Sequence, residues 1–197
     1  MKLFFTFLFI LISTTFSQAQ DANKNIGLTF SLPWINNYTY YNYELNSLTN
    51  KSGFSGFGIA IYLNQSKNKF SLNAEVLGDS PMPFGVEYVI KGPISNISAT
   101  LIELNYQKYL FKKVSLILGV NKIYDHFNFK NYEDSLKDYL KTDQMYGMTL
   151  GAEYIFTSHF SLASFYRLAF PDNSYRHIIS IDLRFNFDLW KKPGMNE

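Results

Sequence analysis

The sequence predicts an all-β protein in which eight antiparallel strands follow one another in up-and-down order. Three observations support this fold class. Apolar and polar residues alternate over several stretches; in residues 179–189 the odd positions are apolar and the even positions are polar. Short and long connections alternate between these stretches. Finally, 18% of the residues are aromatic, with 15 Tyr and 19 Phe, and such a composition favours strands.

The N-terminus has the pattern of a secretory signal peptide. Lys2 precedes an apolar run, and small residues lead to a cleavage site after Ala19. We therefore expect a signal peptide at residues 1–19 and a single domain at 20–197. The chain has no cysteine, which excludes disulfides and thiolate metal sites. After residue 19, no apolar run is long enough for a transmembrane helix.

The first half of the domain contains four alternating stretches. Pro33 is expected to end the first of them, because proline cannot donate to a strand ladder. The tyrosines of the long connection that follows could continue the strands. The four expected strands are residues 25–32, 54–64, 69–77 and 97–110.

The second half contains four more stretches, which begin after a tight turn at Phe111 and Lys112. Residues 131–141 fit a short surface helix and a solvated loop about equally well. The expected strands are residues 113–127, 145–156, 160–170 and 175–190.

An even number of alternating strands, with short turns at one end and long loops at the other, is typical of outer-membrane barrels. Over about residues 25–190 the chain resembles the small eight-stranded outer-membrane β-barrels of Gram-negative bacteria. In that family the closing strand ends the chain at an aromatic residue. Phe187 and Trp190 fit this role, although the tail KKPGMNE follows them. The resemblance implies a transmembrane barrel with short periplasmic turns and longer extracellular loops, located in the outer membrane.

A soluble ligand-binding barrel in the periplasm would also alternate, but its apolar side chains would point inward. Small residues on the polar parity favour the opposite orientation, because a narrow barrel has a crowded interior and glycine is a poor choice for a solvent-facing strand. Glycines at the middle of the barrel would also leave room for long side chains from the opposite wall. The small residues are Gly27, Gly56, Gly58, Ala60, Gly119, Gly147, Gly151 and Ala163.

Aromatic residues gather at both ends of the expected strands, as in the two aromatic girdles of a membrane barrel. Those near the short turns are Tyr106, Tyr109, Tyr154, Phe156, Phe160 and Trp190. Those near the long loops include Trp34, Tyr146 and Phe170.

Six charged residues on the inward parity are expected to form an ionic network inside the barrel. Counted from the short turns, five of them lie near mid-height and Glu153 lies lower. Burying one such charge alone would be costly, whereas paired charges satisfy one another. We expect replacement of Arg167 to lower stability more than replacement of Lys130 in a loop. The six residues are Glu75, Glu103, Glu153, Arg167, Asp182 and Arg184.

A barrel of eight strands is just wide enough to be filled by side chains. The sequence therefore predicts a non-catalytic structural or interaction component of the cell envelope, alone or as a subunit of a larger outer-membrane assembly. Outer-membrane lipid is an expected partner, and other outer-membrane or periplasmic proteins are candidates. No cofactor or metal site is expected, and the net charge of +2 indicates no nucleic-acid partner.

One alternative is a lipid-A-modifying hydrolase. A family of outer-membrane deacylases uses a His-x-Ser-Asn motif with a glutamate partner. Here His126 is followed by Phe127 and Asn128, so asparagine stands in place of the serine. A histidine at the outer rim without catalytic function is the favoured interpretation. His159 and His177 have no evident partner in the sequence.

Overall fold

The computed structural model describes residues 24–42, 46–52, 55–78, 94–129, 139–170 and 176–191. The expected signal peptide lies outside these residues, and so does Lys130. The strands are β1 (Lys24–Asn42), β2 (Ser47–Ser52), β3 (Ser55–Gln65), β4 (Asn68–Gly78), β5 (Ile94–Phe111), β6 (Val114–Phe129), β7 (Tyr139–Ile155), β8 (Phe160–Phe170) and β9 (Arg176–Lys191). No helix in the described part of the chain could cross a membrane.

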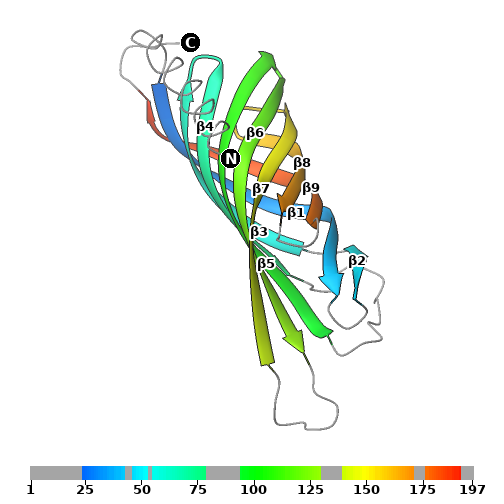
Figure 1. Cartoon of the computed structure of the whole chain (residues 1–197). Helices are drawn as coiled ribbons and strands as arrows, with labels where there is room; N and C mark the ends of the chain where they lie inside the picture. Colours follow the sequence, from blue (N-terminus) through cyan, green and yellow to red (C-terminus); the bar gives the residue numbers. More distant parts are fainter. Residues whose placement is uncertain are drawn as a thin grey trace.

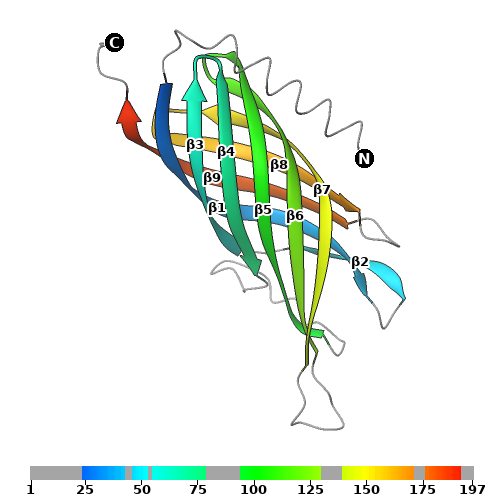
Figure 2. The ribbon, with the colours of Figure 1, turned by 60° about the vertical axis from the view of Figure 1, so that its left-hand side comes forward.

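The strands form one closed antiparallel barrel. Each strand from β3 to β9 pairs with the next, and β1 pairs with both β3 and β9, which closes the cylinder (Figure 1). Figure 2 shows the strands strongly tilted around the barrel axis, as closure of so few strands requires. The expected eight-stranded antiparallel up-and-down barrel is thus confirmed.

β1 is longer than the sequence indicates. Pro33 does not end it: Pro33 pairs with Asp182, and the register then shifts before Ile35 pairs with Ile181. Proline is tolerated at such a bulge because the ladder is already interrupted there. Beyond the bulge, β1 runs on to Asn42 and pairs with β2, a short additional strand outside the barrel closure.

Three strands extend past the long-loop rim. Residues 94–97 of β5 pair only with β6, and residues 139–145 of β7 pair only with β6, among the strands that the structure describes. Figure 1 shows β5, β6 and β7 projecting together away from the barrel. We call this part the projecting blade (residues 94–97, 127–129 and 139–145). Of residues 131–141, for which the sequence allowed a helix or a loop, Tyr139, Leu140 and Lys141 belong to strand β7. The other residues of this segment lie outside the described part of the chain.

The apolar parity faces outward, as expected. In β4, Leu72 and Val76 are 52% and 53% exposed, whereas Asn73 and Glu75 between them are buried. The same alternation continues around the barrel, so large aliphatic and aromatic side chains cover its outer wall. A soluble barrel with an apolar interior would have the reverse arrangement, and the structure rules out that interpretation.

The interior is not polar along its whole length. Toward the long loops, inward-facing apolar side chains form a buried cluster above the central charges. The parity of single strands did not identify this cluster, because aliphatic residues occupy both faces of the strands there. Its members are Tyr38, Leu77, Ala99, Leu101, Ile123, Met145, Ala169 and Ile178.

The inward glycines make room for neighbours on adjacent strands. A Cβ atom on Gly119 would collide with the side chain of Asn105, its direct partner on β5. A Cβ on Gly151 would lie 2.9 Å from the Phe165 ring, its partner on β8. We expected these glycines to make room for side chains from the opposite wall of the barrel. This is wrong, because the space beside each glycine is filled by the side chain of its partner on the adjacent strand.

Candidate functional site

Arg167 is the centre of a buried ionic layer at mid-height in the barrel. Its Nε donates to Glu103 Oε1 at 2.8 Å, and its Nη2 donates to Glu75 Oε2 at 3.0 Å. The carboxylate of Asp182 lies 3.9 Å from the same Nη2. Nη1 donates to Ser180 Oγ at 2.7 Å. The guanidinium thus faces three carboxylates contributed by three different strands.

Sheet register explains why these groups meet. Arg167 pairs with Thr149 across β8 and β7, and Thr149 Oγ1 donates to Glu103 Oε1 at 2.7 Å. Asn121, on β6 between β7 and β5, donates to Thr149 Oγ1 at 3.0 Å. Hydrogen bonds therefore connect β5, β6, β7 and β8 within this layer, which is 0–4% exposed at its four charged residues.

A second ionic layer lies closer to the short turns. Arg184 Nη1 donates to Glu153 Oε1 at 3.2 Å, and Ser161 Oγ donates to the same oxygen at 2.5 Å. Gln107 donates to Glu153 from β5. Lys69 contributes a further buried cation, with its Nζ 4.2 Å from the centre of the Tyr62 ring.

The six charged residues identified in the sequence therefore divide into two groups. Arg184 lies with Glu153 in the lower layer, not at mid-height with Arg167, because Arg184 pairs with Ser161 at the start of β8. Asp182, two residues earlier, reaches the Arg167 layer.

A third charged group, near the long loops, was not identified in the sequence. Arg176 forms an ion pair with Asp125, and its Nη2 lies 3.5 Å from Asp143. The Tyr38 hydroxyl donates to Asp125. Asp125 continues the inward parity of β6 and could have been found from that pattern. Tyr38 could not, because its inward orientation depends on the bulge after Pro33.

The interior charges are suited to holding strands together. The ion pairs of the two lower layers join buried groups, and their exposed fractions are at most 4%. Such burial separates the charges from any substrate outside the barrel. In the part of the chain that the structure describes, no three His, Asp or Glu residues are arranged to hold a metal ion.

The three histidines lie outside these layers. His126 faces outward on β6, with Nδ1 3.2 Å from Thr142 Oγ1 and Nε2 3.4 Å from Thr100 Oγ1. The side chains of Phe127 and Asn128 are outside the described residues. His159 Nδ1 lies 3.1 Å from the backbone oxygen of Asn186, and His177 Nδ1 lies 2.6 Å from the Tyr166 hydroxyl.

Aromatic residues occupy the outer wall near both rims. Near the short turns, the rings of Phe156 and Phe160 stack with their centres 5.3 Å apart. Tyr109 is an exception: it pairs with the buried Ser115 and shares the inward parity, so its assignment to the girdle is wrong. The Trp34 side chain lies outside the described residues. The remaining candidates face outward: Tyr106, Tyr146, Tyr154, Phe156, Phe160, Phe170 and Trp190.

Solved structures with the same fold exist. Ail, the attachment invasion locus protein of Yersinia pestis, matches with a TM-score of 0.57 and 9% identity, covering 85% of this chain and all of that one. The N-terminal β-barrel domain of Pseudomonas aeruginosa OprF matches with a TM-score of 0.55 and 10% identity, covering 84% of this chain and 99% of that one. Neisserial surface protein A matches with a TM-score of 0.55 and 12% identity, covering 82% of this chain and 97% of that one.

At these identities the likeness concerns the fold alone. The chain has the fold of the small eight-stranded outer-membrane β-barrels of Gram-negative bacteria, as the sequence resemblance implied. No protein-family model matches the sequence, and no curated protein matches it.

Proposed function

We propose that the chain is a non-catalytic outer-membrane protein, exported by its signal peptide, that acts as a structural or interaction component of the cell envelope. The observation that carries this proposal is the charged and apolar filling of the barrel. Arg167 and Glu103 are 1% and 0% exposed, and an apolar cluster lies between them and the long loops. This filling argues against passage of solutes through the barrel.

The projecting blade is the part best suited to an interaction. Residues 139–145 of β7 and 94–97 of β5 offer backbone donors and acceptors that no strand of the described chain pairs on their outer side. Open edges of this kind can bind another chain by strand addition. A partner protein, in the membrane or outside the cell, would be bound there.

Conductance in a planar lipid bilayer tests the filled barrel. We expect the purified protein to insert without giving a steady ohmic current, because ion pairs and aliphatic side chains cross the lumen at several heights. A stable current that increases linearly with voltage would contradict the proposal. N-terminal sequencing of the exported protein should begin at Gln20.

The hydrolase alternative has weaker support. The described polar contacts of His126 are to two threonine hydroxyls, so the carboxylate that would orient a general base is not among them. Mass spectra of lipid A from a deletion strain separate the two functions. We expect unchanged spectra, whereas an additional acyl chain on the lipid A of the deletion strain would favour the hydrolase.

A further inference from the structure

Lys122 is an outward-facing cation held between two tyrosine rings. Its Nζ lies 4.6 Å from the centre of the Tyr124 ring, on the same strand, and 5.2 Å from the centre of the Tyr146 ring, its cross-strand partner on β7. Cation–π contacts of this kind hold an ammonium group over the ring faces, and side-chain hydrogen bonds to Tyr124 and Tyr146 add to them. The tyrosine hydroxyls could add two further donors.

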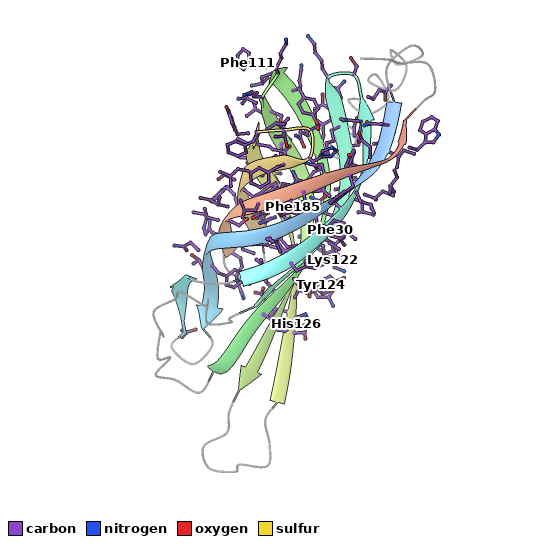
Figure 3. The ribbon with its side chains drawn as sticks, turned by 180° about the vertical axis from the view of Figure 1, so that it is seen from behind. Phe30, Phe111, Lys122, Tyr124, His126 and Phe185 are labelled. Atoms are coloured by element: carbon purple, nitrogen blue, oxygen red, sulfur yellow. The ribbon has the colours of Figure 1, made fainter. Side chains whose placement is uncertain are left out.

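Along β6, the outward-facing residues change from apolar to polar at Lys122. Outward positions from the short turn are apolar through Leu116, Leu118 and Val120, and then polar from Lys122 through His126. Figure 3 shows Lys122, Tyr124 and His126 in this order along the strand, far from Phe111 at the short-turn end. In a membrane barrel this change marks the boundary between acyl chains and headgroups of the outer leaflet.

Lys122 has no carboxylate beside it on this wall. The described outward positions of β5, β6 and β7 carry two charges, Lys108 near the short turns and Lys122 near the long loops, and both are positive. The immediate outward neighbours of Lys122 across the strands are Ile102 and Tyr146. The ammonium group is therefore a cation without a protein counter-ion in the described part of the chain.

We propose that Lys122, Tyr124 and Tyr146 form a binding site for the phosphate of an outer-leaflet lipid headgroup. The phosphate would accept hydrogen bonds from the ammonium group and the tyrosine hydroxyls. The acyl chains would cover the apolar wall directly below, where Leu104 and Met148 are 48% and 43% exposed. This wall favours a lipid over a free anion, because a free anion would leave the apolar surface uncovered.

The inference depends on the proposed outer-membrane location but not on the filled barrel or the lack of catalysis. Native mass spectrometry of the detergent-solubilised protein would count bound molecules of diphosphoryl lipid A, fully dephosphorylated lipid A and inorganic phosphate. We expect retention of diphosphoryl lipid A and about fivefold weaker binding by Lys122→Gln, which corresponds to the roughly 1 kcal/mol that one lysine contributes near anionic lipid. Lys122→Arg should retain binding.

Lys108→Gln is the matched control, because Lys108 is also an outward lysine on the same sheet but lies near the short turns. It should bind diphosphoryl lipid A as the unmodified protein does, and heat-modifiable migration in gels should show that every variant is folded. Equal effects of the two substitutions, unchanged binding by Lys122→Gln, or equal binding of the dephosphorylated lipid would overturn the proposal. Displacement of the lipid by millimolar inorganic phosphate would show a free-anion site instead of a lipid site, and would also overturn it.

Discussion

The lumen and the outer wall of the barrel are built from the same strands, but they depend on different properties of the sequence. On the wall, we expect exposed aliphatic side chains such as Leu118 to be interchangeable, since a surface that faces lipid needs only to be apolar. In the lumen, Arg167 reaches Glu75, Glu103 and Asp182 at particular distances, and a substitution on one strand leaves charges unpaired on others. Alternation of residues therefore specifies the wall, whereas register specifies the lumen.

The largest expected effect is in the Arg167 layer. Arg167→Met should lower the free energy of unfolding by about 3–5 kcal/mol, because it leaves buried carboxylates without their cation. Arg184→Met should cost less: Glu153 keeps the donors Ser161 and Gln107. Urea unfolding in lipid vesicles measures both. Unfolding of the two variants at the same urea concentration would contradict the larger contribution to stability expected of the Arg167 layer.

Introducing a charged side chain on the outer wall should lower stability, whereas changing the shape of an aliphatic side chain there should not. Leu118→Arg should cost about 2–4 kcal/mol if Leu118 lies near the middle of the membrane, because the guanidinium would be placed in hydrocarbon. Leu118→Ile should be close to neutral and serves as the matched control. Urea unfolding in the same vesicles gives both values. A tolerated arginine at this position would mean that lipid does not cover this part of the wall.

A smaller effect is expected where the lumen is crowded. Gly119→Ala should cost about 1–3 kcal/mol, because the new Cβ would overlap the Asn105 side chain across the strand pair. Adding Asn105→Ala should recover part of the loss by removing the overlapping amide. Unfolding midpoints of the single and double variants provide the test, and a double variant less stable than Gly119→Ala would argue against this packing.

The strand pattern was sufficient to predict the barrel, its strand number and the direction of the apolar face. It also identified six charged residues of the inward parity, but not the buried charges of Lys69, Asp125 and Arg176. It did not separate Arg184 from the Arg167 layer. That separation depends on the pairing of Arg184 with Ser161, which is a property of two strands together.

Other features depend on local departures from regular strands. The bulge after Pro33 reverses which residues of β1 face inward, and it thereby brings Tyr38 to Asp125. The inward apolar cluster is hidden for another reason: Leu101 and Ile102 are both apolar, so residue type does not distinguish the buried one, and only the parity shared with Glu103 places Leu101 inside. The projecting blade follows from unequal strand lengths, which connection lengths do not define.

The orientation of the two faces can be measured directly, since the chain has no native cysteine. Nitroxide labels at Leu118→Cys on the wall and at Lys112→Cys in a short turn can be compared by power-saturation electron paramagnetic resonance in lipid vesicles. We predict that the label at position 118 is relaxed by lipid-dissolved oxygen and protected from a water-soluble nickel complex, with the opposite result at position 112. A label at 118 that is accessible to the nickel complex and not to oxygen would contradict the account.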